Sequence, residues 1–129
     1  MDCLFCKIIN REIPCYKIYE NDYVLAFLDI NPDSDGHTLI IPKKHFTDVD
    51  DIDENTLFEI FKSAKLVKKL LEEKLNCDGM TLLQNNGSVQ EVKHFHLHLK
   101  PYYNNKPSIE IKKNNEYIKN VKEIYELFN

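Results

Sequence analysis

The sequence predicts an α+β protein with a mainly antiparallel sheet that is covered by helices on one face. Three observations support this prediction. They are several short runs rich in β-branched and aromatic residues, one long segment with apolar residues at helical spacing, and a strict alternation of histidines with apolar residues at 94–99. Because the helical segment separates groups of strands instead of alternating with single strands, the order of elements is typical of the α+β class.

The first half of the chain is predicted to hold a short helix and three strands. Residues 3–10 carry apolar side chains at helical spacing, and Pro14 is expected to end this helix. A turn at residues 20–22 joins the first two strands into a hairpin, and the loop at 29–36 is dense in turn-forming residues. The three expected strands are residues 16–19, 23–28 and 37–42.

The second half is predicted to begin with the one long helix. Asp53, Glu54 and Asn55 open it, and apolar residues at a period of 3.6 continue it to about Leu75, a length of roughly 33 Å at 1.5 Å per residue. We expect this helix to pack on the core and to have no catalytic role. The elements expected after it are a strand at 80–84, a turn at 85–88, a strand at 92–101, a short strand at 109–111 and a helix at 115–128. Pro101 either ends its strand or lies where its missing N–H does no harm.

The composition indicates one domain and excludes some partners. With 129 residues, 43% of them hydrophobic, the chain is interpreted as a single domain, residues 1–129, with a core at about 2–102 and a C-terminal extension at 103–129. A net charge of −4 and a pI near 5.7 argue against broad binding to nucleic acid but allow a small anionic substrate. Since neither a signal peptide nor a membrane span is recognisable, we expect a cytoplasmic protein without a membrane partner.

The alternating run at 92–101 is the most informative stretch. His94, His96 and His98 share one face of the predicted strand. Neighbours on that face are roughly 7 Å apart and the outer two roughly 13 Å, whereas zinc binds a histidine nitrogen at about 2.1 Å. One metal is therefore not expected to hold all three, and the spacing favours a division of roles. The alternative is a solvated strand face that happens to be rich in histidine.

A second pattern concerns metal binding. Cys3 and Cys6 have the spacing of a zinc knuckle, but a second such pair is absent from the sequence, so two ligands must come from elsewhere. His45 and His94 are the best candidates, because adjacent strands can bring both to the N-terminal turn. Four protein ligands leave no open position, which makes such a zinc structural. The alternative is that the two thiols pack as small apolar side chains.

The remaining histidines and a polar turn point to phosphorus chemistry. A neutral His96 whose Nδ1–H is held by a backbone carbonyl presents Nε2 as a nucleophile, and His98 can donate to a phosphoryl or leaving-group oxygen. The turn from Asn85 to Ser88, with Gln90, is rich in donors that can cradle phosphate, although the turn taken alone is better explained as an ordinary hairpin turn. Asp29 is either a turn cap or a carboxylate that accepts from sugar hydroxyls.

Four blocks in this order resemble the histidine-triad family of nucleotide hydrolases and transferases. They are Cys-Leu-Phe-Cys-Lys-Ile-Ile at 3–9, Leu-Ala-Phe-Leu-Asp-Ile at 25–30, Gly-His-Thr-Leu-Ile-Ile-Pro-Lys-Lys-His at 36–45, and the His-x-His-x-His run at 94–98. The resemblance implies a five-stranded antiparallel sheet that is extended by dimerisation, with transfer of a nucleotidyl group to His96. It also implies structural zinc, as in members with the paired cysteines.

By the same resemblance, individual residues acquire expected roles. Apolar side chains line the purine pocket, Asp29 holds the ribose hydroxyls, His37 is buried beside the active site, and three residues contact the α-phosphate. The expected purine-pocket residues are Leu4, Phe5, Ile8, Phe27 and Ile30; the expected phosphate contacts are Asn85, Gln90 and His98; the expected zinc ligands are Cys3, Cys6, His45 and His94; the expected catalytic residues are His96 and His98.

The sequence departs from the family pattern at three places. The small Ala-Gly pair before the glutamine is absent, Glu91 stands where many members have Ser or Thr, and Lys100 stands at an apolar position of the motif. A carboxylate at Glu91 repels phosphate unless it is turned away. Since Lys100 shares the histidine face by alternation, it either pairs with Glu91 or reaches toward a substrate's outer phosphates.

Three hypotheses follow for the function. The first is a hydrolase that cleaves purine nucleoside phosphoramidates or dinucleoside polyphosphates at the α-phosphate through a nucleotidyl-His96 intermediate. The second is a zinc-stabilised nucleotide-binding interaction module with little or no turnover. The third is a metal hydrolase with zinc at the histidine triad itself.

Overall fold

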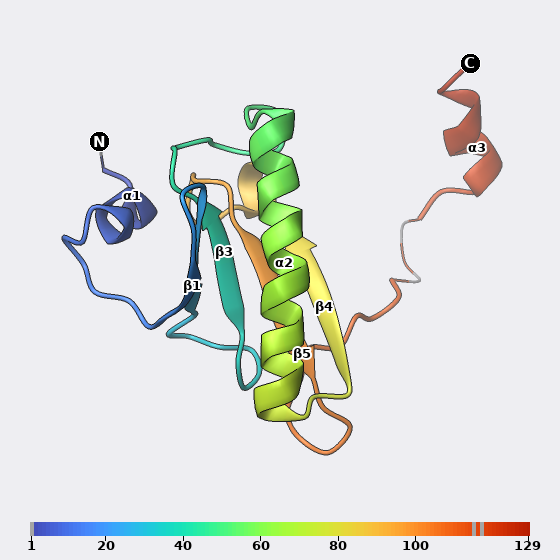
Figure 1. Cartoon of the computed structure of the whole chain (residues 1–129). Coiled ribbons are helices and arrows are strands. Elements are labelled where there is room, and N and C mark those ends of the chain that lie inside the picture. Colours follow the sequence, from blue (N-terminus) through green and yellow to red (C-terminus); the bar gives the residue numbers. More distant parts are fainter. Residues whose placement is uncertain (1, 115, 117) are drawn as a thin grey trace.

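The computed structural model describes residues 2–114, 116 and 118–129. In this part of the chain five strands form one antiparallel sheet, with three α-helices and a 3₁₀ helix around it (Figure 1). The predicted α+β class, with a five-stranded antiparallel sheet and one long helix, is confirmed. The elements in chain order are α1 (Leu4–Ile9), β1 (Lys17–Glu20), β2 (Val24–Leu28), β3 (Thr38–Pro42), α2 (Glu54–Leu75), β4 (Gly79–Gln84), η1 (Gly87–Val89), β5 (Leu97–Tyr102) and α3 (Val121–Glu126).

The strand order places the histidine-bearing strand inside the sheet. The order is β1-β2-β3-β5-β4, so β5 lies between β3 and β4 and pairs antiparallel with both. In the β3–β5 register Leu39 lies opposite His98, and Ile40 lies opposite Leu97. Strand β3 is therefore brought beside the histidine run, which is about 60 residues away in the sequence.

Helix α2 covers one face of the sheet and forms the larger core. Asp53 caps its N-terminus by accepting from the backbone N–H of Thr56, and Asn76 ends it in the left-handed conformation. Because side chains alternate along a strand, one set of strand residues meets the apolar stripe of the helix. The fully or nearly buried members of this core include Val24, Ala26, Ile40, Ile60, Ala64, Val67, Leu71, Phe95, Leu97 and Leu99.

Helix α1 packs on the opposite face, where a second apolar cluster forms. The cluster joins Phe5 to the strand residues Leu25, Phe27, Leu39 and Ile41. Helix α1 ends at Ile9, five residues before the proline expected to end it, because Arg11 adopts the left-handed conformation with φ 64°. The expectation that helices cover only one face of the sheet is therefore wrong, because α1 covers part of the other face. This α1 side is the side toward which His94 and His96 point.

The predicted strand at 92–101 is wrong in its first half, because β5 begins only at Leu97. Strand β3 ends at Pro42. The backbone carbonyl of Pro42 accepts a hydrogen bond from the His94 side chain, at 2.9 Å from Nε2, and not from the backbone of a neighbouring strand. The residues at 92–96 consequently follow an irregular path. The alternation itself holds through this change, since Phe95 joins the core under α2 while His94 and His96 lie toward α1.

Pro101 lies within β5 rather than ending it, and the sheet explains why this is tolerated. Its carbonyl accepts from the Ser34 hydroxyl at 2.6 Å, on the side beyond the last β3–β5 pair at Thr38 and Leu99. The N–H and C=O positions of one strand residue point to the same side of the strand. The missing donor of the proline therefore faces a loop and not a partner strand.

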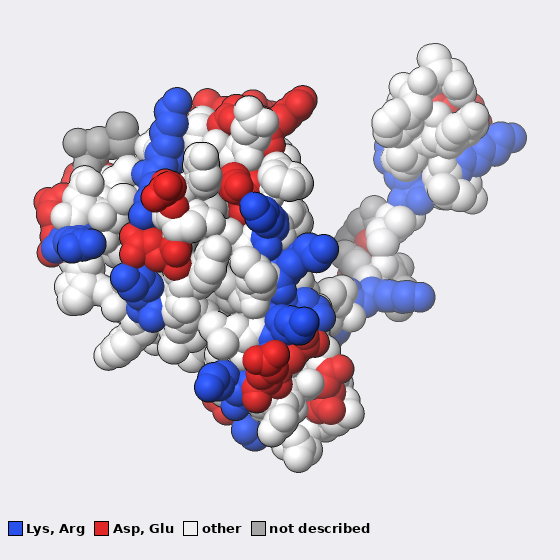
Figure 2. Space-filling model, viewed as in Figure 1, with Lys and Arg blue, Asp and Glu red and all other residues white. Residues whose placement is uncertain are grey.

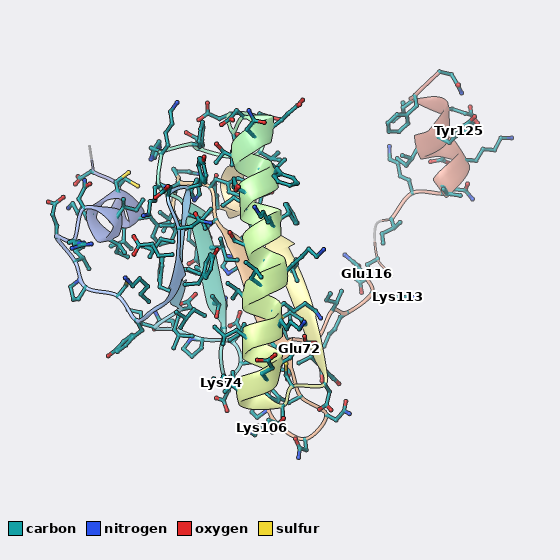
Figure 3. The ribbon with its side chains drawn as sticks, in the orientation of Figure 1. Glu72, Lys74, Lys106, Lys113, Glu116 and Tyr125 are labelled. Carbon is teal, nitrogen blue, oxygen red and sulfur yellow. The ribbon has the colours of Figure 1, made fainter. Side chains whose placement is uncertain are left out.

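The C-terminal segment differs from its prediction. The expected strand at 109–111 is absent from the described residues, and the terminal helix is limited to α3; Asn115 and Tyr117 of the predicted helix lie outside the described residues. Helix α3 buries none of its side chains and stands away from the sheet, as Figure 3 shows for Tyr125. None of the helices described has the length and apolarity needed to cross a bilayer.

Candidate active site and metal centre

Two cysteines and two histidines converge at the N-terminus of α1. The Nδ1 atom of His94 lies 3.3 Å from Cys3 Sγ, 3.5 Å from Cys6 Sγ and 3.1 Å from the Nδ1 atom of His45. Cys6 Sγ lies 3.4 Å from that same His45 atom. All four candidate ligand atoms lie within 4.8 Å of one another. The four residues predicted from spacing are thus brought together from α1, the segment after β3 and the segment before β5.

These distances fit a single tetrahedral metal ion. With Zn–S near 2.3 Å and Zn–N near 2.1 Å, neighbouring ligand atoms are separated by about 3.4 to 3.8 Å, within a few tenths of an ångström of the distances found. His94 donates Nε2–H to the Pro42 carbonyl at 2.9 Å, which leaves Nδ1 unprotonated. Burial lowers the pKa of His94 to about 4, so the ring is neutral, as a ligand must be. Burial, and to a smaller extent the neighbouring Cys3 thiol, raises the pKa of Cys6 to about 11. A bound cation would reverse this shift, because it stabilises the thiolate.

His96 is held in one tautomer by its own backbone neighbour. Its Nδ1–H donates to the carbonyl of His94 at 2.7 Å, so the lone pair is on Nε2. The ring is 4% exposed, and burial lowers its pKa. Phe5 of α1 packs edge-on against His96 at 5.1 Å between ring centroids and against His94 at 5.9 Å. One aromatic ring therefore packs against both the Cys₂His₂ cluster and the His96 ring.

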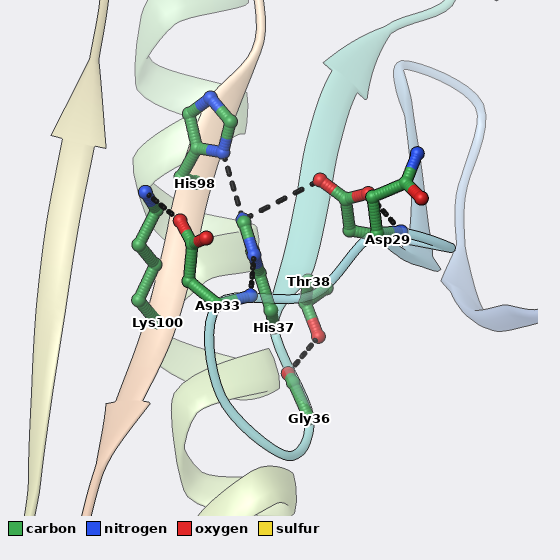
Figure 4. Close-up of polar contacts among 8 residues, drawn as sticks. Asp29, Asp33, Gly36, His37, Thr38, His98 and Lys100 are labelled. Atoms are coloured by element: carbon green, nitrogen blue, oxygen red, sulfur yellow. Dashed lines mark hydrogen bonds and ion pairs between the residues drawn. The ribbon is translucent and has the colours of Figure 1, made fainter. Parts of the chain in front are cut away.

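A chain of hydrogen bonds fixes the tautomer of His98 in the same way (Figure 4). The backbone N–H of Asp33 donates to Nδ1 of His37 at 3.1 Å, which places the proton of that ring on Nε2. This Nε2–H in turn donates to Nδ1 of His98 at 2.9 Å. The second ring nitrogen of His98, Nε2, is then an N–H donor, and it points away from His37 (Figure 4). Burial lowers the pKa of His98 to about 3, so the ring is neutral.

The same contacts argue against a metal ion at Asp29, His37 and His98, although their ligand atoms are close enough for one. Asp29 Oδ2 lies 3.6 Å from Nε2 of His37. Because Nδ1 of His37 accepts a backbone N–H, metal binding at Nε2 would require the imidazolate form of the ring. A neutral hydrogen-bonded relay accounts for the geometry without that step.

A cleft with two compartments opens beside His96 and His98. The apolar compartment, about 240 Å³, contains all five side chains expected at a purine: Leu4, Phe5, Ile8, Phe27 and Ile30. The polar compartment, also about 240 Å³, is lined by Asp29, Asn31, Asp33, His37, Asn85, Glu91 and Lys100. Both compartments include His96, His98 and Glu91, so the two imidazoles lie where an apolar ring and a polar chain would meet.

Of the three residues expected to contact the α-phosphate, Asn85 and His98 line the polar compartment and Gln90 does not. Asn85 lines the polar compartment, but Gln90 is 5% exposed and donates its amide to the Thr47 carbonyl. Glu91, the next residue, lines the cleft in its place. The proposed pairing of Lys100 with Glu91 is wrong, because its Nζ lies 2.6 Å from Asp33 Oδ2. Local sequence gives no signal for that partner, which comes from a loop 67 residues away.

The sheet, the Cys₂His₂ cluster and the row of neutral imidazoles at one cleft define a small α+β protein with a histidine-based active site. A HIT domain model matches residues 10–105, and the chain belongs to this family. Over 101 residues it is 46% identical to an adenosine 5′-monophosphoramidase of Saccharomyces cerevisiae, covering 77% of this chain and 61% of that protein.

Solved structures agree with this assignment. A HIT family protein from Bacillus anthracis superposes with a TM-score of 0.85 at 36% identity, covering 98% of this chain and 92% of that chain. A Zn-bound histidine triad family protein from Mycobacterium smegmatis superposes with a TM-score of 0.79 at 35% identity, covering 90% and 86%. The resemblance predicted from the four sequence blocks is confirmed.

Proposed function

We propose that this protein hydrolyses purine nucleoside 5′-monophosphate derivatives, through a nucleotidyl group carried transiently on His96. The observation that supports this most directly is the hydrogen bond from His96 Nδ1 to the His94 carbonyl, which leaves Nε2 with a lone pair at the junction of the two compartments. The yeast relative named as a phosphoramidase supports the same reaction class.

The proposed reaction has two displacements at phosphorus. In the first, Nε2 of His96 forms a bond to the α-phosphorus as the bond to the leaving nitrogen or oxygen breaks. The ring becomes a cation, which the carbonyl of His94 stabilises by accepting from Nδ1–H. His98 donates a hydrogen bond from Nε2–H to the phosphoryl oxygen or the departing atom, and the leaving group takes up a proton from solvent. In the second displacement, water attacks phosphorus and releases a proton to solvent, and the bond to His96 breaks so that His96 leaves as the neutral ring.

The apolar compartment supplies the binding energy that positions the nucleotide. We infer that the purine lies among Leu4, Phe5, Ile8, Phe27 and Ile30, and that Asp29 accepts from the ribose hydroxyls. Asp29 already accepts from the backbone N–H of Asn31 at 2.9 Å through Oδ1, and it retains 21% exposure for a ligand. Asn85 and His98 are the proposed α-phosphate contacts. The corresponding role of Gln90 remains a prediction that requires its amide to leave Thr47.

We infer that zinc is the metal of the Cys₂His₂ cluster and that its role is structural. Cys3, Cys6, His45 and His94 would hold it, and it would tie α1 to the segments that carry the histidines. The fit of the four ligand atoms to a tetrahedron supports this inference, as does the Zn-bound neighbour.

We also propose that the whole chain is one domain and that two copies form a dimer. Strand β4 is an edge of the sheet, with Leu82 41% exposed, and α2 presents Phe58, Phe61 and Leu66 to solvent. Figure 2 shows acidic and basic side chains interspersed over this face, with uncharged surface between them. A second copy paired along β4 would cover these side chains. The cytoplasmic location and the absence of nucleic-acid and membrane partners remain predictions from the sequence.

The central proposal is tested by mixing the protein with an adenosine 5′-phosphoramidate and measuring AMP release by chromatography. We expect turnover by the wild type and none by His96→Asn, with nucleotide affinity in calorimetry within a few-fold for both. Nucleotide binding without turnover in the wild type would overturn the proposal. It would favour the interaction module, for which the observation is the carboxylate of Glu91 in the cleft beside His96.

A further inference from the structure

The polar compartment is acidic once its own ion pairs are taken into account. It contains three carboxylates, on Asp29, Asp33 and Glu91, and one ammonium group, on Lys100. Lys100 is largely buried, with 12% of its side chain exposed, and it is paired with Asp33 at 2.6 Å. That pair contributes no net charge. Two negative charges remain, on Asp29 and Glu91, and Glu91 lines the cleft with His96, where a substrate's leaving group would lie.

The two remaining carboxylates, on Asp29 and Glu91, differ in the contacts that they already make. Asp29 accepts from Asn31 and lies 3.6 Å from Nε2 of His37, on the wall shared with the apolar compartment. Glu91 is exposed, and within the described part of the chain it has neither an ion-pair partner nor a hydrogen-bond partner. It lines both compartments next to His96. An incoming ligand therefore meets an uncompensated negative charge beside the nucleophile.

This charge acts differently on the two classes of leaving group that the proposed function allows. A polyphosphate or sulfate group is anionic and is repelled by the carboxylate. An amine that carries a further ammonium group is attracted, and a hydrogen bond between charged groups is stronger than one between neutral groups. Lys100 does not offset the difference, because its ammonium is already bound to Asp33.

We propose that Glu91 is a specificity-determining residue, which makes the protein selective for nucleoside phosphoramidates whose amine leaving group carries a positive charge. The inference rests on the proposed hydrolase function and specifies the substrate class of the same site. Glu91 is assigned no part in bond making or breaking. It binds the cationic end of the leaving group while His96 and His98 act at phosphorus.

The test compares three substrates that share adenosine 5′-phosphate. One has a 4-aminobutylamine leaving group, one has the isosteric pentylamine, and the third is adenosine 5′-phosphosulfate. For the wild type we expect kcat/KM to favour the aminobutyl over the pentyl substrate by about tenfold, the lower end for a hydrogen bond to a charged group. In Glu91→Gln we expect this ratio to fall to near one, and in Glu91→Lys to invert. Glu110→Gln changes the net charge equally outside the cleft and should keep the wild-type ratio.

Each other outcome counts against one specific statement. If none of the substrates is turned over, the proposed hydrolase function fails. If the substrates are turned over but the ratio is near one in the wild type, or is the same in Glu91→Gln, the role of Glu91 fails while the hydrolase function stands. Turnover of the phosphosulfate that requires Mg²⁺ in the wild type and not in Glu91→Gln would also overturn the proposed role of Glu91. The carboxylate would then bind a metal cation that assists an anionic leaving group, and it would not select a cationic amine.

Discussion

At the scale of single residues, hydrogen bonds to the backbone decide what each imidazole can do. The carbonyl of His94 accepts a hydrogen bond from Nδ1–H of His96, so that Nε2 of His96 is unprotonated. The backbone N–H of Asp33 orients His37, which donates to Nδ1 of His98, so that the proton of His98 is on Nε2. Two rings with the same chemistry thus become an acceptor and a donor. The alternation at 94–98 predicted these two roles, but the partners that enforce them come from distant segments.

The pH dependence of kcat/KM follows from burial of these rings. His96 acts with Nε2 unprotonated, and burial lowers its pKa below the ordinary value of 6.5. Burial also lowers the pKa of His98, to about 3. The reactive neutral forms therefore persist as the pH falls through 6.5. We expect kcat/KM for a phosphoramidate to be constant from pH 8 to 6.5 and to decline only at lower pH, after subtraction of acid hydrolysis of the substrate. A decline with its midpoint at or above pH 6.5 would contradict this prediction.

At the scale of elements, α1 joins the metal centre to the cleft. This helix has six residues and is too short to be stable alone. Its Cys3 and Cys6 lie at the metal cluster, and its Phe5 packs against both His94 and His96. Docking of α1 therefore depends on the cluster, and the apolar compartment depends on α1.

Removal of the cysteine ligands should test this dependence. In the double variant Cys3→Ala/Cys6→Ala we expect loss of bound zinc and of about 4 kcal/mol of stability, the value for a ligand at a thousand times its Kd. Nucleotide affinity should also fall, because α1 supplies three side chains of the apolar compartment, the proposed site of the purine. Elemental analysis, denaturant unfolding and calorimetry measure these effects.

The other two cysteines provide a matched control. Cys15 and Cys77 have free thiols that belong to neither metal-ligand cluster, so Cys15→Ala/Cys77→Ala should retain one zinc per chain. Retention of zinc by the Cys3→Ala/Cys6→Ala variant would place the metal at the histidine triad instead, which is the third hypothesis drawn from the sequence.

At the scale of the whole molecule, the exposed apolar side chains gather on surfaces that the single chain leaves uncovered. Several of them lie on α2, on the edge strand β4 and at the C-terminal end of the chain, where Val121 of α3 and the residues that follow this helix, Leu127 and Phe128, are each more than three-quarters exposed. Exposure on this scale is typical of an interface. The HIT domain match ends at residue 105, so the segment that carries α3 lies beyond the residues matched by that domain model.

The proposed dimer predicts a solution mass about twice the 15.3 kDa of one chain, measured by light scattering. Leu82→Lys places a charge on the β4 edge, and we expect it to shift the mass toward that of one chain, because a lysine on an edge strand opposes pairing. Val49→Lys changes a side chain of similar exposure, 43%, in the loop before α2 and should leave the mass unchanged. A wild-type mass near 15.3 kDa would contradict the dimer.

Periodicity and residue type determined the class of this protein. Apolar spacing located α2 and the strands, because burial of one face follows directly from the repeat of each element. Cysteine spacing, the histidine run and the place of His45 after the strand at 37–42 pointed to the candidate metal ligands and the two catalytic candidates, since few residue types can do that chemistry. The departures at Glu91 and Lys100 were also visible in the sequence alone.

The tertiary structure decided which of these residues meet. It ended the regular strand at Leu97, paired Lys100 with Asp33, turned Gln90 toward Thr47 and left Glu91 open to the cleft. Each of these outcomes depends on a loop that packs against a distant strand. Local sequence patterns describe how a segment repeats, whereas a hydrogen bond between segments depends on the path of the chain between them. The character of the cleft beside His96 is for this reason a property of the fold.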